Sequence, residues 1–292
     1  ITYGDWSSDV CSSDLQKKDY LDKLIEKHIT ALGYDFLRDQ LEMLPVVKAM
    51  SEIVGSTAIL IAAEYLSNNF NGKGELLGGI TGIPPSEVVI LGAGIVGEFA
   101  ARTAIGLGAT VKVFDSSVYR LKRLQNNIGQ RVYTSIISPN TLTKSLRQAD
   151  VVIGAIYSPD GRTPCVVSED MVSEMKFGSV IVDVSIDQGG CFETSEVTTH
   201  STPIFRKYGV IHYCVPNIAS RVARTASYAL SNIFAPILLK MGEEGGVEEL
   251  IWKDPHVRAG FYLHKGTVTN KFVSELFGVP YRDLNLLIAS RI

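Results

Sequence analysis

The stretch VVILGAGIVGEFAARTAIGLGATVKVFDSS, residues 88–117, decides the fold of this chain. Its first apolar run meets Gly92, Gly94 and Gly97, which are spaced as G-x-G-x-x-G and open a helical pattern. After a strand, the first glycine of such a motif permits a tight turn, the second lets the backbone approach a pyrophosphate, and the third lets helix and strand pack closely. The phosphates would lie on the free N–H groups of the helix start. The glycines alone are as typical of a structural turn as of a dinucleotide site. After an apolar strand and before a helix, they predict a dinucleotide-binding turn.

An acid follows at the spacing that a dinucleotide site requires. Asp115 ends the next apolar run, 23 residues after Gly92. A carboxylate at this place accepts the ribose hydroxyls of the adenosine and repels a 2′-phosphate, which favours NAD over NADP. Arg120, one turn into the following helix, either covers the adenine or is a solvated helix charge.

Short apolar runs and helical patterns alternate along the middle of the chain. Strands are expected at 88–91, 110–114, 131–137, 151–156, 179–185 and 210–215. Helices are expected at 95–107, 117–127, 139–149 and 168–176. This alternation predicts an α/β fold with a Rossmann-type, doubly wound parallel sheet that is covered on both faces.

Three longer helices are expected outside this alternation. Residues 16–32 place Leu21, Leu24, Ile25, Ile29 and Leu32 on one apolar stripe. A second helix is expected from Ser51, as candidate N-cap, to about Asn68, apolar on most faces and therefore deeply buried. A long helix after Ser220 leaves the sheet domain, and the tail beyond it shows only short helical patterns.

Length and composition limit the classes of function. The 292 residues are enough for two domains, and a formal net charge of −3 does not suggest nucleic-acid binding. The four cysteines form no C-x-x-C pair, so we expect reduced thiols in a cytoplasm. The longest continuous apolar stretches are too short to span a bilayer, so no membrane association is expected, and residues 1–15 lack the features of a signal peptide.

A second informative stretch, VIVDVSIDQGGCFETS at residues 180–195, contains the catalytic candidate. Strand alternation puts Asp183, Ser185 and Asp187 on one face, before a Gln-Gly-Gly turn. Ligands of open parallel sheets bind beyond the carboxyl ends of the strands, so Asp187 is placed to meet the nicotinamide end of a cofactor, unless it only caps the turn. Asp183, deeper in the strand, is expected to be a structural, hydrogen-bonded carboxylate.

The histidines offer no alternative chemistry. His28, His200 and His264 are expected to be packed or loop residues, and His212 to be buried in a strand. None has metal-ligand spacing or forms a catalytic triad in a recognisable order, so no metal site is expected.

Several blocks resemble, in order and spacing, the C-terminal two thirds of bacterial L-alanine dehydrogenases, which are relatives of the transhydrogenase α subunit. The blocks are PVVKAMSEIVGSTA at 45–58, GKGELLGGITGIPPSEVVILGAGIVG at 72–97, the 180–195 stretch, TTH at 198–200 and HYCVPNIAS at 212–220. The resemblance implies an NAD domain inserted into a catalytic domain, and the reversible conversion of L-alanine, NAD⁺ and water to pyruvate, ammonium and NADH. It also implies a homo-oligomer, since family members are hexamers.

Carried over position by position, the family's cofactor contacts fall on residues in seven places along the chain. They are Ser51; Ile95 and Val96 beside Gly92, Gly94 and Gly97; Asp115 and Arg120; Ser138; Ile156 and Tyr157; Val184, Ser185, Ile186 and Asp187; and Val215, Pro216, Asn217 and Ile218. Strict spacing for the family's serine lands on Ile137, with Ser138 next to it. Ile218 stands where the family usually has methionine, and it is expected to cover one face of the nicotinamide, with Asn217 near the substrate.

The same resemblance gives the expected domain boundaries. Residues 16–45 would be a remnant of the N-terminal catalytic domain, 46–225 the NAD-binding domain and 226–292 helices that return to the catalytic domain. The repeated Ser-Ser-Asp within residues 1–15 resembles translated adapter DNA, so we expect this segment to be non-native and the chain to be N-terminally truncated.

Hydride transfer from alanine also needs a cation for the substrate carboxylate and an acid–base group. The family supplies an arginine, a lysine and a histidine, and all three correspond to positions upstream of Gln16. The leading reading is therefore an alanine dehydrogenase fragment that binds NAD(H) without turning over alanine. The alternatives are a transhydrogenase α-type NAD(H)-binding component and a non-catalytic NAD-binding module.

Overall fold

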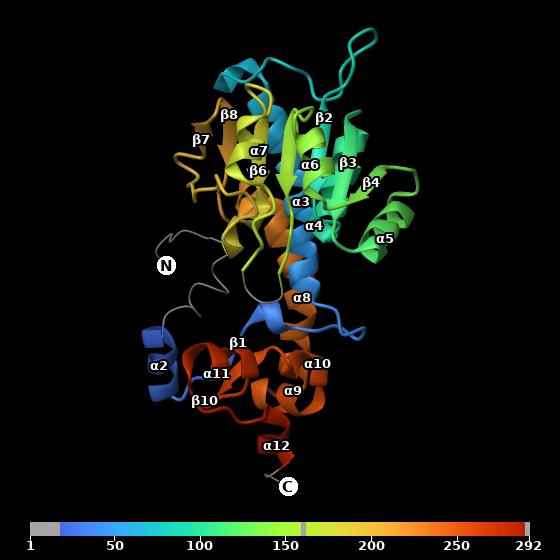
Figure 1. Cartoon of the computed structure of the whole chain (residues 1–292). Helices are drawn as coiled ribbons and strands as arrows, with labels where there is room; N and C mark the ends of the chain where they lie inside the picture. The colour runs from blue at the N-terminus through green and yellow to red at the C-terminus, as the bar shows by residue number, and fades with distance from the viewer. Residues whose placement is uncertain (1–17, 159–161, 290–292) are drawn as a thin grey trace. The chain divides into compact units, whose positions relative to one another are not determined.

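The structure is a computed structural model that describes residues 18–289 except 159–161 (Figure 1). The segment 1–15, which we expect to be non-native, lies outside the described residues. The chain divides into two compact units. One is Ser51–Val222, and the other joins the described residues up to Met50 with those from Ala223 onward.

The unit Ser51–Val222 is built on a seven-stranded sheet with the order β4-β3-β2-β5-β6-β8-β7. All neighbours are parallel except β7 and β8, which are antiparallel. The strands are β2 (Glu87–Leu91), β3 (Thr110–Asp115), β4 (Tyr133–Ile136), β5 (Val151–Gly154), β6 (Val180–Asp183), β7 (Ile204–Lys207) and β8 (Val210–Tyr213). The chain runs outward from β2 to β4 and then crosses to β5, which is the doubly wound arrangement, so the predicted fold class is confirmed.

Successive residues of each strand enter two different cores. Val88 and Ile90 of β2 pack with the helices on one face, and Val89 and Leu91 pack on the other. The first core contains apolar residues of α3 (Pro45–Leu66), α4 (Ile95–Gly106) and α5 (Val118–Ile128). The second contains those of α6 (Pro139–Leu146) and α7 (Glu169–Ser173). Both faces of the sheet are therefore covered by helices, as the continuous apolar strands require (Figure 1).

The helix α3 begins earlier than the sequence suggests. The structure starts it at Pro45, so Ser51 lies inside the helix and its prediction as N-cap is wrong. Proline is favoured at the first position of a helix because its missing N–H is not needed there. Among the described residues, α3 is the one helix long and apolar enough to cross a membrane, with a mean hydropathy of 1.6 over its most apolar window. Its residues Ala58, Ile59, Ile61, Ala62 and Leu66 are at most 2% exposed in the first core, as expected of a core helix.

The other unit contains a small antiparallel sheet with the order β1-β9-β10. Its strands are β1 (Ala31–Leu32), β9 (Phe261–His264) and β10 (Thr267–Val268). Its helices are α2 (Lys18–Glu26), α8 (Ala223–Glu243), α9 (Val247–Lys253), α10 (Pro255–Arg258), α11 (Lys271–Phe277) and α12 (Leu284–Ala289).

Two expectations for this unit are wrong. The helix predicted over 16–32 ends at Glu26, because His28 takes a left-handed conformation and Ala31 pairs with Leu263 of β9. Pairing with a strand far along the chain overrides the helical periodicity. The strands of the tail were also not anticipated, since β9 is a run of four buried residues without alternation.

Candidate functional site

Most of the predicted cofactor residues lie at one edge of the seven-stranded sheet. Gly92 follows β2, Asp115 ends β3, Ser138 lies two residues beyond β4, Ile156 two beyond β5, Val184 follows β6 and Val215 lies two beyond β8. These strands are parallel, so their carboxyl ends meet at the same edge. The strand order reverses between β2 and β5, which is where open α/β sheets bind ligands.

The glycine loop is shaped by two glycines that packing requires. A Cβ on Gly92 would lie 2.2 Å from the carbonyl oxygen of Ala155, and Gly92 also has a φ of +111°. A Cβ on Gly97 would lie 1.9 Å from the carbonyl oxygen of Gly92. A side chain at either position would push the start of α4 away from the strands β2 and β5.

Gly94 differs from both neighbours. Its φ of −76° suits any residue, and a Cβ there would meet no atom within 4 Å. Neither backbone strain nor packing therefore explains a glycine at this position. The open space in front of it lies at the start of the 12-residue helix α4, where Ile95 and Val96 are half-buried and free N–H groups attract an anion. The loop thus has the form of a pyrophosphate cradle that a Cβ would fill.

Asp115 connects the acid at the end of β3 to this loop. Its Oδ2 accepts the N–H of Ala93 at 2.7 Å, and its Oδ1 accepts the N–H of Ser117 at 2.7 Å. Arg120 approaches with an N···O distance of 3.8 Å. The carboxylate is only 3% exposed, so the structure gives it a second role that the sequence did not suggest, holding the glycine loop against β3.

Ser51 and Ser138 approach the same edge from two helices. Ser51 lies one turn before Gly55 on the same face of α3, and a Cβ on Gly55 would be 2.4 Å from the carbonyl oxygen of Val96. Ser138 precedes α6, and its hydroxyl donates to Thr141 Oγ1 at 3.0 Å. Both serines are half-buried.

The turn after β6 presents the catalytic candidate. Residues Val184–Gln188 form a 3-10 helix, η4, in which Ser185 and Ile186 are buried and Asp187 is exposed. The Ser185 hydroxyl donates to the carbonyl oxygen of Ile156 at 2.9 Å. The Gln188 side chain accepts the N–H of Ser158 and donates to its carbonyl oxygen, both at 3.1 Å. The η4 turn and the loop that contains Ile156 and the exposed Tyr157 are therefore held together.

The loop after β8 has an unusual backbone conformation at Asn217, whose φ is +55°. The Ser220 hydroxyl donates to the carbonyl oxygen of Asn217 at 2.9 Å and lies 2.8 Å from Nε2 of His200. The sequence offered no signal for this link, because His200 is far from Ser220 along the chain. Val215 and Ile218 are buried in the first core, and Ile218 is 3% exposed, so its side chain leaves little surface for a nicotinamide.

Two buried ionisable groups lie in β8 and directly after it. Burial lowers the pKa of His212 to about 4, and its Nε2 lies 2.8 Å from the hydroxyl of Thr194. Burial likewise raises the pKa of Cys214 to about 12, so this thiol is inert. Among residues 18–158 and 162–289 no group of three His, Cys, Asp or Glu side chains comes together as metal ligands.

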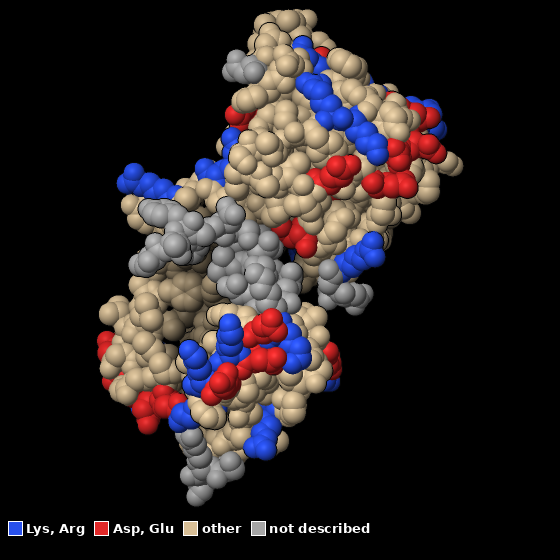
Figure 2. All heavy atoms as spheres, turned by 90° about the vertical axis from the view of Figure 1, so that its left-hand side faces the viewer, with Lys and Arg blue, Asp and Glu red and all other residues tan. Residues whose placement is uncertain are grey.

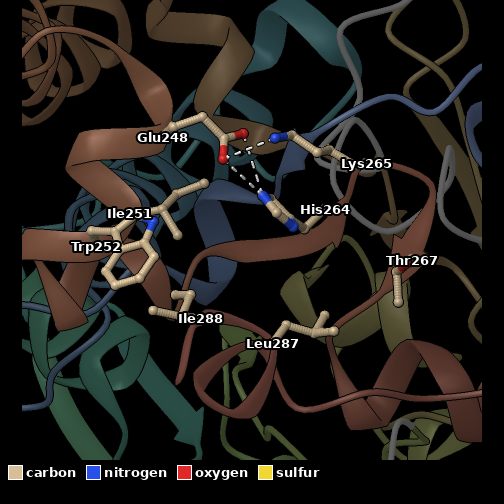
Figure 3. Close-up of a pocket in the computed structure, with 8 residues that line it drawn as sticks. All are labelled: Glu248, Ile251, Trp252, His264, Lys265, Thr267, Leu287 and Ile288. Atoms are coloured by element: carbon tan, nitrogen blue, oxygen red, sulfur yellow. Dashed lines mark hydrogen bonds and ion pairs between the residues drawn. The ribbon is translucent and has the colours of Figure 1, made fainter. Parts of the chain in front are cut away.

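The other unit has a hollow of its own, of about 200 Å³ (Figure 3). His264 and Lys265 point toward Glu248 on one side, with N···O distances of 3.3 Å and 3.1 Å, and Trp252 and Ile288 lie on the other. His264 is in β9 and 7% exposed rather than in a loop as expected. Although burial acts in the opposite sense, the hydrogen bonds from Lys265 and His264 lower the pKa of Glu248. Because these charges pair with one another, we assign no catalytic role to them.

Acidic and basic side chains are interspersed on the face of the molecule that Figure 2 shows. This mixture is in keeping with the small net charge of −3. It presents no large surface of one sign on that face.

Comparisons with known proteins agree on one family. A family model described as "Alanine dehydrogenase/PNT, C-terminal domain" matches residues 58–271. An alanine dehydrogenase from Halomonas elongata is 40% identical over 265 residues, which are 91% of this chain and 71% of that protein. One from Methanococcus maripaludis is 41% identical over 259 residues, or 88% of this chain and 69% of that protein.

Solved structures give the same result. An L-alanine dehydrogenase superposes with a TM-score of 0.85 at 35% identity, covering 90% of this chain and 73% of that one. The transhydrogenase from Sinorhizobium meliloti has a TM-score of 0.71 at 21% identity, covering 87% of this chain and 72% of that one, and so shares the fold.

Proposed function

This chain belongs to the alanine dehydrogenase/PNT family, and from that premise we propose that it binds NAD(H) and serves the reversible oxidative deamination of L-alanine to pyruvate and ammonium. The observation that carries the proposal is Gly94. It is the one glycine of the motif that the fold does not require, and it faces the open space where a pyrophosphate would lie. The proposed NAD-binding domain is 46–225.

At the adenosine and pyrophosphate end, the residues present have the chemistry that the cofactor needs, whereas buried Ile218 would need to move to cover the nicotinamide. The N–H groups at the start of α4 would hold the pyrophosphate. Asp115 would accept the ribose hydroxyls with the lone pairs that Ala93 and Ser117 leave free, and its charge would repel a 2′-phosphate. The remaining proposed contacts are Ser51, Arg120, Ser138, Ile156, Tyr157, Val184 to Asp187 and Val215 to Ile218.

When bound, NAD supplies the hydride acceptor, and the chain's own residues must orient it and move protons. Asp187 projects from η4 at the carboxyl edge of the sheet, where we propose that its carboxylate is a partner in the proton network. Asn217, held in its left-handed conformation by the loop after β8, is the proposed neighbour of the substrate.

The family's substrate-binding arginine and lysine and its catalytic histidine are assigned to none of the described residues. We therefore propose that this chain, as given, binds NADH without turning over alanine. The lack of an assignment for these three residues also favours the second candidate function, a non-catalytic NAD-binding module. The two differ in one experiment. Joining the chain to the N-terminal part of an alanine dehydrogenase, which supplies the arginine, lysine and histidine, should restore alanine-dependent NAD⁺ reduction in the first case and leave binding alone in the second.

Two further proposals concern the state of the protein. We propose a homo-oligomer, which light scattering during gel filtration tests directly, since a monomer at micromolar concentration would contradict it.

We also propose a cytoplasmic location, in which the free thiols of Cys165, Cys191 and Cys214 remain reduced. Titration of these thiols in protein isolated without reductant tests that proposal.

A further inference from the structure

Asp183 is a completely buried carboxylate that the proposed reaction does not use. It is the last residue of β6, is 0% exposed and immediately precedes the η4 turn. A buried carboxylate is costly unless hydrogen bonds compensate it, so its partners indicate what it is for.

Those partners lie within the η4 turn and in the segment that follows it. Oδ1 accepts the N–H of Ser185 at 3.0 Å, and the Cys191 thiol lies 3.8 Å from the same oxygen. Oδ2 accepts the N–H of Cys191 at 3.0 Å and the hydroxyl of Ser195 at 2.6 Å. One side chain thus ties Ser185, inside the turn, to two residues that follow the turn.

The space around this carboxylate is closed by glycines. A Cβ on Gly154, at the end of β5, would lie 2.7 Å from Oδ1 of Asp183. A Cβ on Gly190 would lie 2.6 Å from Oδ2, and Gly190 has a φ of +79°. The carboxylate therefore fills a fixed place between β5 and the end of the turn, with no room for a larger group.

The turn that Asp183 holds contains Asp187. Asp187 is exposed while Ser185 and Ile186 beside it are buried, so the position of its carboxylate follows the position of the whole turn. The side chains of Ser185 and Gln188 also reach the loop after β5. That loop is itself part of the proposed cofactor site, whereas Asp183 ties the turn to the end of β6, inside the sheet.

We propose that Asp183 is a positioning residue, which sets the η4 turn and Asp187 against the nicotinamide end of the bound cofactor, with Ser195 as its main side-chain partner. This inference rests on the proposed function. Burial raises the pKa of Asp183, and the hydrogen bonds from Ser195, Cys191 and Ser185 act against that rise. Their loss would leave the carboxylate both uncompensated and free to change its place.

The test compares NADH with ADP-ribose, which has the adenosine and pyrophosphate parts of NADH and lacks the nicotinamide. Calorimetry gives Kd for both ligands in the full chain, and the fluorescence of bound NADH reports the surroundings of the nicotinamide. Asp183→Asn should raise the Kd for NADH by about tenfold and alter the fluorescence of bound NADH, while the Kd for ADP-ribose stays unchanged. Ser195→Ala, which keeps the carboxylate of Asp183, should raise the Kd for NADH by about threefold.

Asp150→Asn is the matched control. Asp150 is a second buried carboxylate, held by Lys73, Lys176 and the N–H of Glu87 at the amino end of the sheet. Its loss should lower stability and leave the ratio of the two Kd values unchanged.

The outcomes separate the inference from the proposed function. An unchanged Kd ratio and an unchanged NADH fluorescence in Asp183→Asn, or in Ser195→Ala if the first variant does not fold, overturn the positioning role alone. An equal loss of both ligands in Ser195→Ala also overturns it, because a general loss of structure would then explain the effect. A wild-type chain that binds neither ligand overturns the proposed function, and this inference with it.

Discussion

The Oδ2 atom of Asp115 accepts the backbone N–H of Ala93 at 2.7 Å, so the acid at the end of β3 holds the middle of the glycine loop after β2. A residue predicted for ribose recognition therefore also holds the loop that would bind the pyrophosphate. The proposed ribose site and the proposed pyrophosphate site therefore both depend on one carboxylate.

Replacing this carboxylate should weaken cofactor binding. Asp115→Ala removes an acceptor of two backbone N–H groups and of the ribose hydroxyls, so Kd for NADH should rise by about tenfold to a hundredfold. Equilibrium titration measures it, with Asp170→Ala, an exposed acid on α7, as control. Unchanged affinity would remove the ribose role. Asp115→Asn keeps the acceptor for Ala93 and loses the charge, so it should admit NADPH.

The three glycines of the motif should separate folding from binding. Gly94→Ala should reduce NADH affinity by at least about tenfold, at a stability cost of at most about 1 kcal/mol as a poorer N-cap. Gly97→Ala should destabilise the protein by about 2 kcal/mol or more, because its Cβ would lie 1.9 Å from the Gly92 carbonyl.

Gly106→Ala, also in α4, is the control, since a Cβ there meets no atom within 4 Å. It should leave NADH binding intact. If Gly94→Ala bound NADH as the wild type does, the open space in front of Gly94 would not be the pyrophosphate site.

The sequence predicted the central sheet closely because both faces of its strands are buried against helices, so each strand is a local run of apolar residues. The run at 110–114 is β3 to within one residue, and that at 151–156 is shortened to β5. Glycine spacing, strand and acid are local signals, so the carboxyl-edge cluster could be predicted from them. The end of the helix predicted over 16–32 could not be predicted, because Ala31 takes its strand conformation from pairing with Leu263, far along the chain.

The parts of the site that the sequence missed are all contacts between distant segments. Ser195 reaches Asp183 and His200 reaches Ser220 through loops whose path follows no periodicity. Asp183 was correctly expected to be a hydrogen-bonded structural carboxylate, yet its partners could not be named. No pattern of residue spacing identifies such a network before the loops are placed.

His212 should make the stability of the fold depend on pH. Its pKa is about 4 in the folded protein and 6.5 as its ordinary value, so the unfolded chain binds more protons between these values. The contribution of His212 to the free energy of unfolding should therefore be fully present above pH 6.5. It should fall as the pH drops toward 4, by about 3 kcal/mol at the lower end.

Urea unfolding of the wild type and of His212→Phe between pH 4 and pH 7 measures this term. Phenylalanine can keep the stacking on Phe205, whose ring centre lies 4.7 Å from that of His212. The variant should lose the part of the pH dependence that His212 contributes. Identical pH profiles for the two proteins would show that His212 is protonated in the folded state as readily as in the unfolded one.

The chain as given should not oxidise alanine. Hydride transfer needs a cation for the substrate carboxylate and a group that exchanges protons with the substrate nitrogen, and we assign neither to the described residues. An absorbance assay at 340 nm with alanine and NAD⁺ should show no NADH formation, with a family member of known activity as positive control. Alanine-dependent NADH formation by these 292 residues would contradict the assignment.

The central claim is that the edge of the sheet formed by Gly94, Asp115 and the η4 turn binds NAD(H). Titrating the purified chain with NADH and, separately, with NADPH tests it most directly. We predict saturable binding of one NADH per chain, with NADPH at least about tenfold weaker because Asp115 repels its 2′-phosphate. Absence of NADH binding, or equal affinity for the two cofactors, would contradict it.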